Sequence, residues 1–132
     1  MSQENVETEN VMRRWLWAFE NDADAFRGIL HPDIAWFQIE EDRSPIYGID
    51  AAVEARRRWL DTWDEHWHDL EEVIEGGDSV VAAIHITARG KASGVEVDIR
   101  FYAQFKVQDD KVIYIYDHED RAAALEAVGL SE

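Results

Sequence analysis

The second half of the chain changes its hydrophobic period, and this change constrains the fold more than any other feature. Apolar and polar residues alternate in four consecutive runs, at about residues 68–75, 79–89, 95–107 and 111–118. Such runs, rich in β-branched and aromatic residues, predict strands. Turns of only a few residues separate them, at Gly76-Gly77-Asp78 and near residues 90–94 and 108–110. Because connections this short join antiparallel neighbours, the sequence predicts an antiparallel meander.

The first half has helical spacing instead. Val11, Trp15 and Phe19 recur at intervals of four, which predicts an amphipathic helix over about residues 4–20. Asp22 or Asp24 is placed to cap a shorter helix, which the proline at position 32 is expected to end because the residue before proline avoids helical backbone.

A strand over residues 34–39 and a polar loop over 40–45 are expected next. A longer helix then follows, with Asp50 as its cap, running to about Trp63 or His66, and a short helix over residues 120–128 closes the chain at Gly129. Helices gathered at the front and strands at the back predict an α+β architecture in which helices cover one face of a curved antiparallel sheet. A gap between sheet and helices would be a natural small-molecule pocket.

Composition sets further bounds. A length of 132 residues predicts one domain spanning residues 1–132. The formal charge of −16 repels phosphate backbones and anionic membrane surfaces, so neither nucleic acid nor a membrane is an expected partner. The beginning of the sequence lacks a signal-peptide pattern, which favours a cytoplasmic protein. The basic run Arg56-Arg57-Arg58 is interpreted as solvated or salt-bridging side chains.

Six segments of the chain carry a family resemblance, at residues 15–22, 30–36, 47–51, 100–105, 110–112 and 124–130. Together and in this order they resemble the SnoaL-like group of the nuclear transport factor two-like superfamily. The resemblance covers nearly the whole chain and implies a cone-shaped α+β fold. It does not fix a reaction, because the superfamily includes isomerases, polyketide cyclases, epoxide hydrolases, dehydratases and non-catalytic modules.

Each enzyme branch can be compared with the residues present. At the positions where ketosteroid-isomerase-like members carry their tyrosine and two aspartates, an approximate alignment places Trp15, Gln38 and Ala103, none of which can abstract a proton. In limonene-epoxide-hydrolase-like members, the first two partners of an Asp-Arg-Asp arrangement would fall near Ile84 and Ile86. The ketosteroid isomerase branch is therefore disfavoured, while of the epoxide hydrolase arrangement only the last aspartate, at Asp117, remains.

The last strand carries the strongest chemical candidate, Asp117. It matches the final aspartate of the epoxide hydrolase arrangement, and Tyr116-Asp117 resembles a pair in polyketide cyclases, although Ile115 replaces the histidine usual there. Alternation aims Asp117 toward the same apolar face as Ile113 and Ile115, where burial would raise its pKa and suit it to general acid or base catalysis. The alternative is that Asp117 only ends the strand and caps the last helix.

Aromatic residues are expected to line the space between helices and sheet, or simply to fill a large core. The predicted cavity residues are Trp15, Phe19, Trp36, Gln38, Trp59, Trp63, Phe101, Phe105 and Ile115. The histidines show no third ligand beside His66 and His68, so no metal is expected and they are interpreted as surface or helix-end residues. No cofactor is implied either.

Polar and aromatic side chains alternate onto the opposite face of the predicted sheet. The set includes His85, Arg100 and Tyr102, and this composition predicts a homodimer through the outer face. The leading hypothesis is a protein that encloses a small, apolar, cyclic molecule, with Asp117 as general acid or base for isomerisation, cyclisation or hydration. The competing hypothesis is a ligand-binding or dimeric scaffold protein without catalysis.

Overall fold

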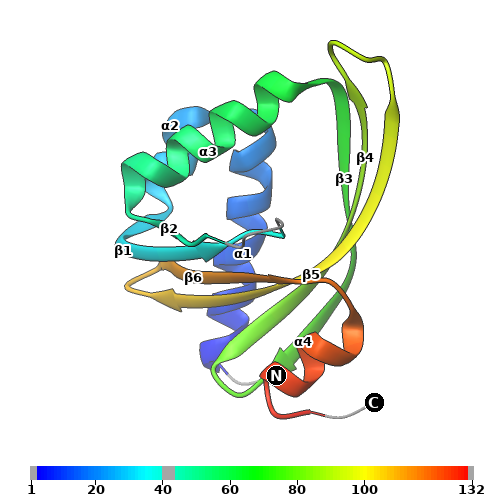
Figure 1. Cartoon of the computed structure of the whole chain (residues 1–132). Helices are drawn as coiled ribbons and strands as arrows, with labels where there is room; N and C mark the ends of the chain where they lie inside the picture. The colour runs from blue at the N-terminus through cyan, green and yellow to red at the C-terminus, as the bar shows by residue number, and fades with distance from the viewer. Residues whose placement is uncertain (1–2, 40–43, 131–132) are drawn as a thin grey trace.

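The computed structural model describes residues 3–39 and 44–130. Its helices are α1 (Gln3–Asn21), α2 (Ala23–Gly28), α3 (Ile49–Thr62) and α4 (Arg121–Ala127). Its strands are β1 (Leu30–Phe37), β2 (Ile46–Tyr47), β3 (Trp63–Gly76), β4 (Ser79–Gly90), β5 (Glu96–Gln108) and β6 (Lys111–His118). Figure 1 shows the long strands β3, β4 and β5 bending around α1, with α3 lying across the open end of the curve.

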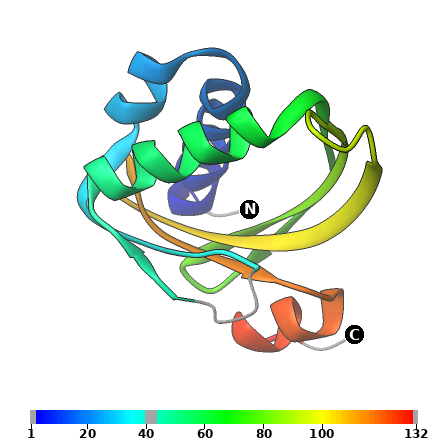
Figure 2. The same ribbon diagram turned by 45° about the horizontal axis from the view of Figure 1, so that its top comes forward.

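The strands form one sheet in the order β2-β1-β6-β5-β4-β3. The predicted meander from β3 to β6 is antiparallel throughout. Strand β1 joins the sheet beside β6 in the parallel direction and also pairs with β2. Helices α1, α2 and α3 lie on the concave side, while α4 lies on the convex side (Figure 2). The predicted α+β class is therefore confirmed, with helices on one face of a curved, open sheet.

Trp15 on α1 is the centre of the packing between helices and sheet. Its ring lies 5.3 Å from the ring of Phe19, 5.5 Å from Trp36 and 5.3 Å from Phe105, measured between centroids. Phe26, which is fully buried, lies 5.7 Å from Trp15 on another side. Aromatic rings at these separations and tilts add to the apolar area they bury, and they fix α1 and α2 against β1 and β5.

The helix α3 begins and ends differently from the sequence prediction. Its N-cap is Gly48, which has a positive φ of 86°, and no side chain caps the helix. Asp50 lies inside the first turn, where its Oδ1 accepts a hydrogen bond of 2.9 Å from Arg27. At the other end the backbone becomes extended at Trp63, so residues 63–67 belong to β3 and not to the helix.

The boundaries of the short elements also shift. Asp22, not Asp24, caps α2 by accepting a hydrogen bond of 3.0 Å from the backbone N–H of Ala25. Strand β1 starts at Leu30, four residues before the predicted position, because its first residue already pairs with Val112 of β6. Of the polar loop expected over residues 40–45, residues 40–43 lie outside the described part of the chain.

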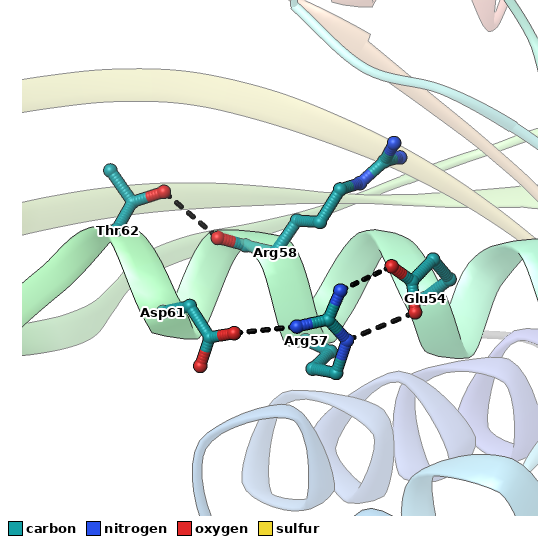
Figure 3. A network of polar contacts seen from close by, with 5 residues as sticks. All are labelled: Glu54, Arg57, Arg58, Asp61 and Thr62. Carbon is teal, nitrogen blue, oxygen red and sulfur yellow. Dashed lines mark hydrogen bonds and ion pairs between the residues drawn. The ribbon is translucent and has the colours of Figure 1, made fainter.

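The basic run on α3 forms local contacts, as the sequence predicts. Arg57 lies between Glu54 and Asp61 on the helix surface and donates hydrogen bonds to both, at 2.6 Å to Asp61 (Figure 3). Arg58 extends away from this pair, and its backbone carbonyl accepts a hydrogen bond from Thr62. Arg56 instead donates to the backbone carbonyl of Phe19 at 2.8 Å, which joins α3 to the end of α1.

Helix α4 covers part of the convex face through Ala124 and Leu125, both buried. Its N-cap is Asp120, whose Oδ1 accepts a hydrogen bond of 2.7 Å from the backbone N–H of Ala123. Within the described ranges, no helix is both long enough and apolar enough to cross a membrane.

Candidate functional site

A pocket of about 180 Å³ lies between the concave face of the sheet and the helices α1 and α3. Its walls are mainly aromatic and aliphatic side chains from seven helices and strands and from the segment that follows β1. The lining residues are Trp15, Leu16, Phe19, Trp36, Gln38, Ile39, Trp59, His68, Ile84, Ile86, Ile99, Phe101, Ala103 and Asp117. A small pocket with apolar walls and few polar groups has the character of a small-molecule site.

Asp117 brings a carboxyl group to this pocket. It is 8% exposed and lies opposite Ala103 in the pairing of β6 with β5. Ala103 also lines the pocket, so the strand alternation directs Asp117 to the concave face. The cap of α4 is made by Asp120, three residues further along. The geometry therefore separates the two roles that the sequence left open for this acid.

Six of the nine side chains expected around the cavity are among the lining residues: Trp15, Phe19, Trp36, Gln38, Trp59 and Phe101. The structure places the other three elsewhere. Phe105 and Ile115 are completely buried in the core, behind the pocket wall. Trp63 ends α3 and packs its ring 5.8 Å from that of Trp59, so it supports a lining residue from outside.

His68 is the titratable pocket residue that the sequence interpretation missed. It was expected on the surface or at a helix end, but it lies on the concave face of β3, opposite Ile86 of β4. Its side chain is only 7% exposed. The alternation of His66, His68 and Leu70 was the available signal. The helical spacing of the preceding tryptophans, which continues to Trp63, hides this signal.

Burial dominates the electrostatics around His68. Desolvation, with repulsion from His66 as a smaller cause, lowers the pKa of His68 to about 4, so its ring is neutral at pH 7. Nδ1 of this ring lies 3.0 Å from Oε1 of Glu20, near the end of α1. Desolvation, with repulsion from Asp69, raises the pKa of Glu20.

Several polar atoms near the pocket have no hydrogen-bond partner within the described residues. These buried atoms include Nε2 of His68 and the indole Nε1 of Trp15 and Trp36. All three side chains line the pocket. Buried polar groups are usually paired, so these three nitrogens are hydrogen-bonding groups without a partner in side chains that line the pocket.

The candidate chemistry is limited to few groups. Asp117 and His68 are the titratable side chains among the described lining residues. The positions aligned with catalytic groups of ketosteroid isomerases and epoxide hydrolases do border the pocket, but they carry Trp15, Gln38, Ala103, Ile84 and Ile86. Within the described ranges, no group of three or more histidine or acidic side chains is arranged to hold a metal ion.

The family model of SnoaL-like domains matches residues 12–115. The chain belongs to the SnoaL-like family. This confirms the resemblance carried by the sequence segments. None of the curated proteins matches this SnoaL-like chain in sequence.

Solved structures of similar shape share the whole architecture at low sequence identity. A candidate SnoaL-like polyketide cyclase from Jannaschia sp. CCS1 has a TM-score of 0.78 and 19% identity, covering 97% of this chain and 95% of that one. TerC, co-crystallised with polyporic acid, has a TM-score of 0.73 and 18% identity, covering 92% and 97%. An epoxide hydrolase of the limonene type from M. tuberculosis has a TM-score of 0.73 and 18% identity, covering 87% and 84%. At these identities the likeness shows the SnoaL-like fold alone.

Proposed function

We propose that this SnoaL-like protein binds a small, apolar, cyclic molecule in the pocket and that Asp117 acts on it as a general acid or base. The reaction class would be isomerisation, cyclisation or hydration, without a cofactor. The observation that carries the proposal is a carboxyl group, 8% exposed, in the wall of a pocket that is otherwise mainly aromatic and aliphatic. General acids and bases of enzymes commonly occupy such sites.

The elementary step needs no partner for Asp117 if the substrate is a carbon acid. The carboxylate takes a proton from the carbon next to a carbonyl group. The electron pair of that C–H bond forms a C=C bond, and the carbonyl π pair moves to oxygen. Return of the proton to the same or another carbon completes an isomerisation. The solved relatives described as a candidate polyketide cyclase and an epoxide hydrolase support acid-base chemistry in this fold.

The second candidate is binding without catalysis. It is favoured by the residues at the aligned catalytic positions, where Gln38 and Ala103 stand in place of acids. TerC, with its co-crystallised polyporic acid, shows that a protein of this shape takes up an organic molecule. Under this alternative Asp117 would only orient a ligand.

Proton exchange separates the two candidates. Cyclohexanone is a ring-sized ketone whose hydrogens next to the carbonyl exchange with D2O, and proton NMR follows their loss. We expect the wild type to accelerate this exchange and Asp117→Asn to reduce the acceleration about 100-fold or more. Asn has nearly the same shape but cannot take the proton, so cyclohexanone affinity should stay within about threefold.

Two other outcomes have distinct meanings. If both proteins bind cyclohexanone and neither accelerates exchange, the non-catalytic alternative is supported. If neither protein binds it at millimolar concentrations, the pocket does not accept ring-sized molecules, and the proposal is wrong.

We also propose that the protein forms a homodimer through the convex face of the sheet. Trp67 is 54% exposed on this face, beside the region that α4 leaves uncovered. Arg100 and Tyr102 follow on β5, and such Trp, Tyr and Arg side chains are enriched in protein interfaces. Light scattering at tens of micromolar should give twice the chain mass, and a monomeric mass would refute the dimer.

A further inference from the structure

The proposed acid-base chemistry needs only Asp117 and does not explain the position of the His68 side chain. Its side chain lies between aromatic rings, with centroids 5.5 Å from Phe19 and 5.1 Å from Trp59. It comes from β3, whereas Asp117 comes from β6, and the strands β4 and β5 separate them in the sheet. The two titratable groups therefore reach the same pocket from strands that are not neighbours.

The contact with Glu20 orients the imidazole ring. Nδ1 of His68 lies 3.0 Å from Oε1 of Glu20, whose side chain is 27% exposed and lies outside the lining of the pocket. The two nitrogens of an imidazole point in nearly opposite directions, so Nε2 points away from Glu20. Nε2 is buried and has no hydrogen-bond partner within the described residues.

The protonation state of the ring follows from its surroundings. The titratable groups around it are Glu20 on α1 and His66 on β3, with Arg56 of α3 acting on His66. Burial keeps His68 neutral at pH 7. A carboxylate only accepts hydrogen bonds, so the contact with Glu20 favours the tautomer with the proton on Nδ1. Nε2 then carries a lone pair and acts as an acceptor.

We propose that Nε2 of His68 selects the ligand by accepting a hydrogen bond from a hydroxyl group on a small neutral ring, such as a phenol or an enol. This inference rests on the proposed function of the pocket and adds the chemical class of its ligand. An imidazole that served only for packing would leave a buried acceptor unpaired, which destabilises a protein relative to an apolar side chain of similar volume.

The size of the pocket and the negative charge of the protein agree with a small neutral ring that carries a hydroxyl group. The volume of about 180 Å³ is slightly larger than the roughly 150 Å³ cavity known to hold benzene, so one substituted ring fits. The formal charge of −16 and the carboxyl group of Asp117 disfavour anionic ligands. A neutral hydroxyl compound is compatible with both.

Phenol and toluene form the matched probe pair, because they have nearly the same shape and only phenol donates a hydrogen bond. Calorimetry would measure both dissociation constants for the wild type, for His68→Leu and for the control His66→Leu. We expect His68→Leu to lower the preference for phenol over toluene about fivefold, the equivalent of about 1 kcal/mol for one hydrogen bond. Toluene affinity should change less than twofold, and His66→Leu should leave the preference unchanged.

A spectroscopic measurement on the wild type makes the test independent of whether His68→Leu folds. In spectra of 15N-labelled imidazoles, Nε2 of His68 should be unprotonated, and phenol should shift its resonance while toluene should not. An unchanged preference in His68→Leu, or no phenol-specific shift, would overturn the inference and leave the pocket function standing. If the wild type binds neither probe, the proposed pocket function itself fails.

Discussion

Nδ1 of His68 on β3 lies 3.0 Å from Oε1 of Glu20 on α1, so a helix and a strand distant in sequence jointly fix one ring in the pocket wall. Asp117 reaches the same pocket from the far side of two intervening strands. The site thus combines one acid with one neutral base, both surrounded by apolar side chains.

The buried state of His68 predicts a pH dependence of stability. Its pKa is about 4 in the folded protein and about 6.5 when unfolded, so the unfolded chain binds more protons between these values. The stabilisation is present above pH 6.5 and is lost as the pH falls toward 4. We expect His68 alone to reduce the free energy of unfolding by about 2 kcal/mol between pH 7 and pH 5.

Urea denaturation at both pH values measures this effect. The raised pKa of Glu20 acts in the opposite direction, so the comparison must be made between the wild type and His68→Leu. The loss of stability from pH 7 to pH 5 should be smaller in His68→Leu. Equal losses in the two proteins would contradict the buried, neutral state of this ring.

The pocket predicts different responses at two paired alanines. Ala103 and Ala82 lie opposite each other on β5 and β4 and are both buried, but only Ala103 lines the pocket. Ala103→Leu should place its added methyl groups in the cavity and weaken toluene binding at least tenfold. It should lower the free energy of unfolding by less than about 1 kcal/mol. Ala82→Leu should cost about 1–3 kcal/mol by overpacking. Calorimetry and urea denaturation test both, and equal costs would argue against an open pocket at Ala103.

The cap of α4 predicts that Asp120 contributes to stability and not to ligand binding, unlike Asp117. Asp120→Ala should destabilise the protein by about 1 kcal/mol, because the backbone N–H of Ala123 loses its acceptor. Ligand affinity should not change. Thermal unfolding combined with toluene titration measures both quantities. A large loss of toluene affinity in Asp120→Ala would show that this acid, and not only Asp117, belongs to the site.

The close approach of β3 to α4 predicts a steric effect at Gly76. A Cβ added there would lie 2.4 Å from Cγ2 of Val128, so Gly76→Ala must displace α4 and should cost about 1–3 kcal/mol. Gly28 is the matched control, since nothing lies within 4 Å of an added Cβ and the residue is helical. Gly28→Ala should be neutral or slightly stabilising. The urea concentration at the midpoint of unfolding should therefore fall in Gly76→Ala and stay the same or rise in Gly28→Ala. Unchanged stability in Gly76→Ala would contradict the docking of α4.

Alternation of side chains along β6 aims Asp117 at the apolar face of the sheet, but it leaves open whether this acid lines a cavity or caps the last helix. The same reasoning failed at His68, because Trp59 and Trp63 have helical spacing and no glycine or proline marks the end of α3 after Thr62. The contact with Glu20 could not be predicted at all, since it depends on how α1 packs against β3. Local sequence patterns therefore point to Asp117, whereas the position of His68 in the site depends on tertiary packing.

The measurement that tests the central claim most directly is a crystal structure of the protein grown with cyclohexanone. The account predicts the ring inside the pocket, in contact with Trp15 and Trp36. A carbon next to the carbonyl group should lie within about 3.5 Å of a carboxyl oxygen of Asp117, a distance suited to proton transfer. A ring bound elsewhere, or Asp117 turned toward the convex face, would contradict the account.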